Sequence, residues 1–110
     1  MFSWYDEIQK IKSWIDSNME EDISLSRLSD YSGYSPFYLS RKFHELEGIS
    51  LKEYLLISKI QHAARQLIET DYRIIDIAMR HGYSSQEAFT RAFMKVYGIT
   101  PWSYRKLQKP

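Results

Sequence analysis

The stretch IIDIAMRHGYSSQEAFTRAFMKVYGITPWSYRK, residues 74–106, decides the fold of this chain. Its first part places the apolar Ile77 beside the small Ala78, and Gly82 then marks a turn. Its second part carries Phe89 and Phe93, which lie four residues apart and therefore share one face of a helix. A short helix, a glycine turn and a second helix in this order are typical of a helix-turn-helix unit.

An earlier stretch, SGYSPFYLSRKFHELEGISLKEY at residues 32–54, repeats this pattern. Residues 33–35 match residues 82–84 at an offset of 49, and one extra residue then shifts the match to an offset of 50. The pairs after the shift are Arg41 and Arg91, Phe43 and Phe93, Gly48 and Gly98, Ile49 and Ile99, and Tyr54 and Tyr104. Two copies in the same order predict two helix-turn-helix units. The alternative is a duplicated helical hairpin with only a structural role.

Capping residues and glycines mark the ends of the predicted helices. The capping signals are Ser3 with Asp6, Ser24, Ser35-Pro36, Ser50 with Glu53, Ser84 with Glu87, and Thr100-Pro101. The four glycines each follow a helical run, where a left-handed C-terminal cap is favoured. We therefore predict an all-α fold with seven helices near residues 4–18, 25–32, 36–47, 51–69, 73–81, 85–97 and 101–107.

These helices predict three parts of the chain. We expect an N-terminal helix-turn-helix subdomain over residues 1–50, a linker helix over 51–70 and a C-terminal helix-turn-helix subdomain over 71–110. The linker helix spans roughly 28 Å at the usual rise per residue. Successive major-groove faces of B-DNA lie roughly 34 Å apart, so one chain has the reach to place two second helices in adjacent segments. Because the two halves differ in sequence, we expect an asymmetric site of about two turns.

The composition argues against several classes of protein. The chain has 110 residues and no cysteine, which removes disulfides, thiolate zinc sites and cysteine nucleophiles. The three histidines lack the short spacing of a helical metal site, and we interpret them as exposed or capping residues. We therefore predict no metal, no cofactor and no enzymatic activity. The absence of a long apolar run and of a signal-peptide pattern predicts a cytoplasmic protein that does not associate with a membrane.

The charge is distributed unevenly. Residues 1–30 carry seven acidic and three basic side chains, a net charge of −4, whereas residues 31–110 carry seven acidic and twelve basic ones, a net charge of +5. A positive later part favours contact with phosphate, although an ordinary solvated surface explains the same distribution equally well.

The residues that would contact DNA follow from the position of each second helix. Base contacts are expected on its outward face near its N-terminus: Phe37, Tyr38, Ser40 and Arg41 in the first unit, and Ser85, Gln86, Glu87, Thr90 and Arg91 in the second. Glu87 has an alternative role as the third residue of a capping box. The expected phosphate contacts are Ser35, Lys42, Ser84 and Lys95, although an ordinary solvated position explains Lys42 and Lys95 about equally well.

Residues 74–106 also resemble the signature of the AraC/XylS family of transcription regulators. The matching residues are Ile77-Ala78, Gly82-Tyr83, Ser85, Phe89, Arg91, Phe93, Gly98, Pro101 and Tyr104-Arg105. Residues 25–55 resemble the less constrained first unit of that family, and the whole resemblance covers residues 6–107. It implies a stand-alone regulator of the MarA, SoxS and Rob type, which binds double-stranded DNA as a monomer, activates transcription and contacts RNA polymerase.

Two further hypotheses assign the protein to other functional classes than DNA-binding regulators. One is a protein-interaction module, such as an antagonist of a larger regulator, that has lost specific DNA binding. The exposed positions expected for Arg41 and Arg91 argue against it. The other is an enzyme, and no nucleophile–base pair in the sequence supports it.

Overall fold

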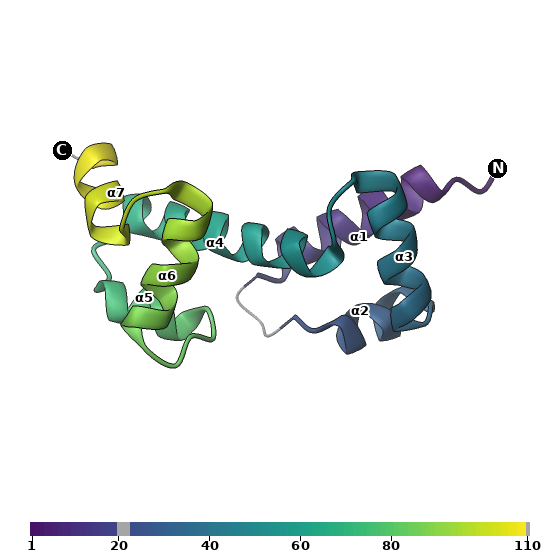
Figure 1. Ribbon diagram of the computed structural model, residues 1–110, viewed down its shortest axis with the longest axis horizontal. Coiled ribbons are helices and arrows are strands. Elements are labelled where there is room, and N and C mark those ends of the chain that lie inside the picture. Colours follow the sequence, from purple (N-terminus) through teal and green to yellow (C-terminus); the bar gives the residue numbers. More distant parts are fainter. Residues whose placement is uncertain (20–22, 110) are drawn as a thin grey trace. The chain divides into compact units, whose positions relative to one another are not determined.

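The computed structural model describes residues 1–19 and 23–109, and within these ranges it is all-α, as predicted (Figure 1). The helices are α1 (Trp4–Ser17), α2 (Leu25–Ser32), α3 (Pro36–Glu47), α4 (Leu51–Glu69), α5 (Ile74–Arg80), α6 (Gln86–Tyr97) and α7 (Pro101–Gln108). Each predicted helix is present, and its ends agree with the prediction to within one residue. The prediction of seven helices is therefore confirmed for the described residues.

The chain forms two compact units, Met1–Leu55 and Leu56–Pro110. The boundary falls inside α4, the helix that we expected to act as a linker. Leu51 belongs to the core of the first unit, whereas Ile60 and Leu67 belong to the core of the second. The two ends of α4 are therefore packing elements of the two units.

The first unit buries one face each of α1, α2 and α3. Along α1, isoleucines at positions 8, 11 and 15 recur at helical spacing and are almost fully buried. They pack with Leu28 of α2 and with Leu39 and Phe43 of α3. Leu39 and Phe43 therefore point inward, which leaves the opposite face of α3 exposed.

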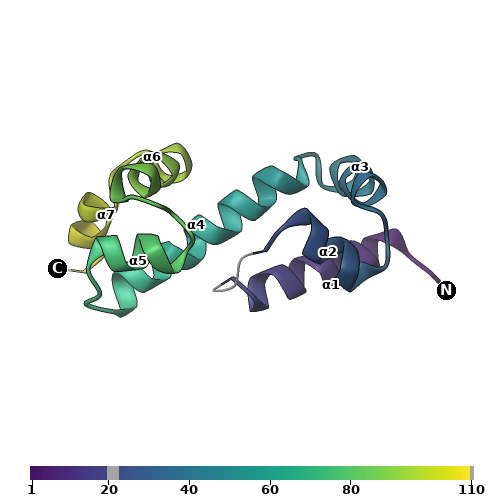
Figure 2. The same cartoon turned by 90° about the horizontal axis from the view of Figure 1, so that it is seen from below.

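The second unit has an aromatic core. Phe89 and Phe93 of α6 are fully buried with ring centroids 5.8 Å apart, and they pack with Ile77 and Ala78 of α5. Tyr104 of α7 meets Phe93 edge-on, with centroids 5.4 Å apart. Figure 2 shows α5 leading through a short turn into α6. The buried phenylalanine face orients α6, whose other face remains exposed.

The predicted N-terminal caps are confirmed except one. The side chains of Ser3, Ser24, Ser35 and Thr100 each accept a hydrogen bond from the backbone three residues later, and Ser50 accepts one from the backbone N–H of Glu53. The exception is α6, where the cap is Ser85 rather than Ser84. Ser85 accepts from the backbone N–H of Ala88 at 3.1 Å, so the predicted pairing of Ser84 with Glu87 is wrong.

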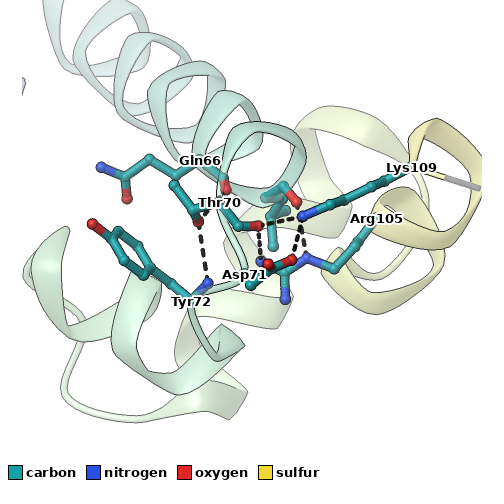
Figure 3. A network of polar contacts seen from close by, with 7 residues as sticks. Gln66, Thr70, Asp71, Tyr72, Arg105 and Lys109 are labelled. Carbon is teal, nitrogen blue, oxygen red and sulfur yellow. Dashed lines mark hydrogen bonds and ion pairs between the residues drawn. The ribbon is translucent and has the colours of Figure 1, made fainter.

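The end of α4 is held by Arg105 of α7 and by Lys109, which follows α7 (Figure 3). Arg105 donates from Nε to the carbonyl of Leu67 at 2.8 Å and from Nη2 to the carbonyl of Thr70 at 3.4 Å. The amino group of Lys109 donates to the same Thr70 carbonyl at 2.8 Å and pairs with Asp71 at 2.5 Å. The last carbonyls of a helix have no partner within the helix, so these two cations satisfy and charge-compensate them.

Candidate nucleic-acid interface

In the first unit, hydroxyl groups hold the turn between α2 and α3. Ser29 donates from Oγ to the carbonyl of Tyr34 at 2.5 Å, and the backbone N–H of Tyr34 donates to Ser32 Oγ at 3.2 Å. Between them lies Gly33 at φ +81°, a backbone conformation that side chains with a Cβ rarely adopt. These contacts hold the chain in the turn between α2 and α3.

The turn before α6 uses the backbone instead. The N–H of Tyr83 donates to the carbonyl of Ala78 at 3.0 Å, and Gly82 has φ +82°. Ala78, the counterpart of Ser29, is fully buried. Ala78 therefore packs in the core of the second unit, whereas Ser29 forms a hydrogen bond to the turn in the first.

The exposed face of α3 carries predicted base contacts. Phe37 is 77% exposed and Tyr38 is 40% exposed, so neither of these adjacent aromatic residues is a core residue. The side chain of Arg41 is 63% exposed, and Ser40 is half-buried beside it. Phe37 therefore presents an apolar surface to solvent with no packing role inside the unit that would explain it.

An aromatic cluster lies at the N-terminal end of the same face. The ring of Trp4 in α1 is 4.8 Å from that of Tyr34 and 5.6 Å from that of Tyr38, measured between centroids. The amino group of Lys42 lies over both Trp4 and Tyr38, at 5.7 and 5.9 Å from their centroids. Trp4 and Tyr34 were not among the predicted site residues, because nothing in the local sequence links the start of α1 to α3.

Glu45 pairs with both cations of α3. Its carboxylate lies 3.3 Å from Arg41 Nε and 3.3 Å from Lys42 Nζ. The hydrogen bond from Lys42, together with its charge and that of Arg41, holds the pKa of Glu45 below its usual value. The signal for this residue was present in the sequence, because positions three and four residues apart are neighbours on a helix.

The exposed face of α6 carries the other predicted contacts. Gln86, Glu87 and Arg91 are exposed, Thr90 is half-buried, and Ser85 is occupied as the N-terminal cap. Lys95 is also exposed. Glu87 occupies the second helical position, so its alternative role as the third residue of a capping box does not apply. Ser84, expected at the cap, lies exposed in the turn.

His44 is exposed, as predicted, and His81 is the C-cap of α5, but His81 also contacts His62 inside the second unit, which the prediction did not include. His81 is 3% exposed, its Nδ1 lies 2.8 Å from the carbonyl of Ile77, and its Nε2 lies 2.8 Å from Nδ1 of His62. Since a carbonyl only accepts, His81 must donate from Nδ1. The pair therefore joins α4 to the turn before α6, because the fold brings residues 19 positions apart into contact. In the described residues no group of three or more potential ligands is placed to hold a metal ion.

Comparison with known proteins gives a consistent result. A family model described as a helix-turn-helix domain matches residues 28–107. The uncharacterized HTH-type transcriptional regulator YbfP of Bacillus subtilis is 40% identical over 102 residues, which make up 93% of this chain and 35% of YbfP. The crystal structure of an AraC-type DNA-binding domain-containing transcriptional regulator from Chromobacterium violaceum matches with a TM-score of 0.88 and 26% identity, and covers 94% of this chain and 93% of that one.

This chain belongs to the AraC family of helix-turn-helix DNA-binding domains. The C-terminal domain of AraT, a response regulator from Geobacillus stearothermophilus, is similar as well, with a TM-score of 0.84 and 30% identity over 94% of this chain and 87% of that domain. The family is one of transcription regulators rather than enzymes. The AraC-type chain spans about a third of the length of YbfP, so the expectation of a stand-alone regulator stays a prediction.

The structure explains several residues of the AraC signature. Ile77 and Phe93 are core residues, and Pro101 is the first residue of α7. Arg105, which was not predicted as a site residue, holds the end of α4. Arg91 is exposed on α6, in the position expected for a residue that contacts DNA. Among the residues with described coordinates, no helix is both long and apolar enough to cross a membrane.

Proposed function

We propose that this AraC-type domain binds an asymmetric DNA site by placing α3 and α6 in successive major-groove segments, and that it activates transcription. The observation that carries the proposal is the pair Arg41 and Arg91, which occupy equivalent positions in the two copies of the motif. Both are exposed, on helices whose opposite faces are buried. A packed inner face with an exposed arginine on the outer face suits a helix that reads base edges.

The residue types assign different chemistry to the two helices. On α6, arginine suits guanine, Gln86 suits adenine and the methyl group of Thr90 suits the methyl group of thymine. On α3, the exposed ring of Phe37 offers apolar contact, and Arg41 supplies the main base-directed hydrogen bonds. We therefore propose that α6 reads mainly by hydrogen bonds and α3 more by apolar contact and shape.

Phosphate contacts are proposed at the starts of both helices and at two lysines. The first turns of α3 and α6, capped by Ser35 and Ser85, have backbone N–H groups that suit an anion. Lys42 and Lys95 would add positive charge farther along each helix. Ser84 lies next to the corrected cap, Ser85. We propose that Ser84 contacts phosphate from the turn that precedes α6.

The partners and location of the protein are part of the same proposal. We expect the domain to bind double-stranded DNA as a monomer in the cytoplasm and to contact RNA polymerase when bound. Transcription in vitro from a promoter that contains the site, with and without the protein, measures the sign of regulation. A fall in transcript on addition of the protein would contradict the assignment as an activator.

Selection of bound duplexes from a random pool, followed by footprinting, tests the DNA-binding mode. We expect one asymmetric site protected over about two turns, with affinity falling steeply as salt rises. A palindromic site bound by two copies would contradict the proposed arrangement. Binding that is absent or insensitive to salt would instead favour the protein-interaction module.

A further inference from the structure

The geometry of α3 suggests a role for Glu45, a residue to which the proposed function gives none. Arg41 donates to the Glu45 carboxylate from Nε, at 3.3 Å. Within the described residues its two Nη groups have no hydrogen-bond partner. An arginine held at Nε keeps its outer edge available, and that edge is the one that pairs end-on with O6 and N7 of guanine.

We propose that Glu45 is a positioning residue that determines the specificity of α3: it orients Arg41 for a base and keeps Arg41 and Lys42 from binding phosphate indiscriminately. The inference rests on the proposed function. Glu45 would not contact DNA, because a carboxylate is repelled by phosphate, and would act only through its two basic partners. The rotamers of Arg41 would otherwise be free, so holding Nε reduces the entropy lost when the arginine meets its base.

The second unit provides an internal comparison. Position 95, which corresponds to 45 at the offset of 50, is lysine. No carboxylate among the described residues lies within ion-pair distance of Arg91 or Lys95. In the described part of the chain neither cation of α6 is held in an ion pair, although the exposed Glu87 lies four residues before Arg91, whereas Glu45 pairs with both cations of α3. We therefore expect Lys95 to add affinity for any DNA alongside the base contacts of α6, and Glu45 to sharpen the discrimination that Arg41 makes on α3.

The proposal predicts opposite effects of Glu45→Gln on two kinds of DNA. On a random-sequence duplex, binding should tighten by about two- to fivefold, since Arg41 and Lys42 become available to phosphate. The salt dependence should steepen by at most about one phosphate contact. On the selected site, binding should be unchanged or weaker, and discrimination at the base pair read by Arg41 should fall by about fivefold.

Fluorescence anisotropy with both duplexes, between about 50 and 200 mM salt, measures these quantities. Glu7→Gln is the control, because Glu7 also forms an ion pair within one helix, with Lys10 at 3.6 Å, on α1 of the same unit. Glu45→Asp separates the two parts of the proposal, since its carboxylate is too short for the same contact. It should keep the weak binding to random DNA but lose discrimination as Glu45→Gln does.

A double-mutant cycle shows whether Glu45 acts through Arg41. In an Arg41→Ala background, Glu45→Gln should no longer change discrimination at any base pair, and its remaining effect should be tighter binding to random DNA through Lys42. If wild-type protein binds the selected site but Glu45→Gln matches Glu7→Gln on both duplexes, the role of Glu45 is refuted and the proposed function stands. If wild-type protein binds neither duplex in a salt-dependent way, both proposals fail.

Discussion

Individual residues of the two exposed helix faces carry the recognition chemistry. Arg41 and Arg91 occupy equivalent positions in the repeat, yet their surroundings differ. Glu45 forms an ion pair with Arg41, whereas the corresponding residue four positions after Arg91 is Lys95. The same residue type is therefore expected to contribute differently in the two units. Charge-assisted hydrogen bonds to a base edge discriminate between sequences, whereas contacts to phosphate do not.

Arg91→Ala should cost about 1–3 kcal/mol at a single base position and relax specificity there. The reason is the loss of a bidentate contact that only one base offers in that geometry. Anisotropy titrations on the selected site and on its single-base variants measure the effect.

Lys95→Ala is the comparison for Arg91→Ala, since it also removes a positive charge from α6. It should weaken binding to all sequences by a similar factor and lower the salt slope by about one. Equal losses on every single-base variant for Arg91→Ala would remove Arg91 from the base-reading face.

At the scale of single elements, side chains satisfy the free backbone groups at the N-terminal end of α6 and at the C-terminal end of α4. The cap of α6 lies at Ser85, so the inserted residue of the second copy is Ser84, in the turn. With this correction the offset of 50 begins at the cap itself, and Ser35 corresponds to Ser85. Arg105 and Lys109 have the opposite role at the C-terminal end of α4, where they bond to carbonyls.

Ser85→Ala should destabilise the protein by about 0.5–2 kcal/mol, because the backbone N–H of Ala88 loses its acceptor. Ser84→Ala is the matched control and should change stability by less than about 0.5 kcal/mol. Urea unfolding followed by circular dichroism compares the two variants. The reverse order of stabilities would restore Ser84 as the cap.

Arg105→Ala should cost about 1–3 kcal/mol, since the carbonyls of Leu67 and Thr70 lose a charged donor in a partly buried setting. Lys106→Ala is a control at the next position, on an exposed side chain that lies over Trp102. Thermal unfolding of both variants, with DNA absent, checks the difference. An Arg105 variant as stable as the Lys106 variant would show that the contacts are not stabilising.

At the scale of the whole molecule, two separate cores support two recognition helices. The first is largely aliphatic, with Phe43 among isoleucines and leucines, whereas Phe89, Phe93 and neighbouring aromatic residues dominate the second. Each core orients one exposed helix face, so damage to one core is expected to affect mainly the DNA half-site read by its own unit.

Phe43→Ala and Phe93→Ala test this independence, and each should cost about 3–5 kcal/mol because both side chains are fully buried. Native-state hydrogen exchange should show amide protection falling first in residues 1–55 for Phe43→Ala and first in residues 56–110 for Phe93→Ala. Uniform loss of protection across both units in either variant would mean that the two cores unfold as one.

The sequence by itself determined the seven helices, their turns and the internal repeat, because caps, glycines and helical periodicity act over a few neighbouring residues. It also identified Phe37, Arg41, Gln86 and Arg91 as exposed residues of α3 and α6, since the opposite apolar faces had to be buried. Only the tertiary structure decided which partners those residues have. The contact of His62 with His81, the packing of Trp4 on Tyr38 and the reach of Arg105 to Leu67 join positions 19 to 38 residues apart. Such contacts depend on how helices cross, which local sequence patterns do not specify.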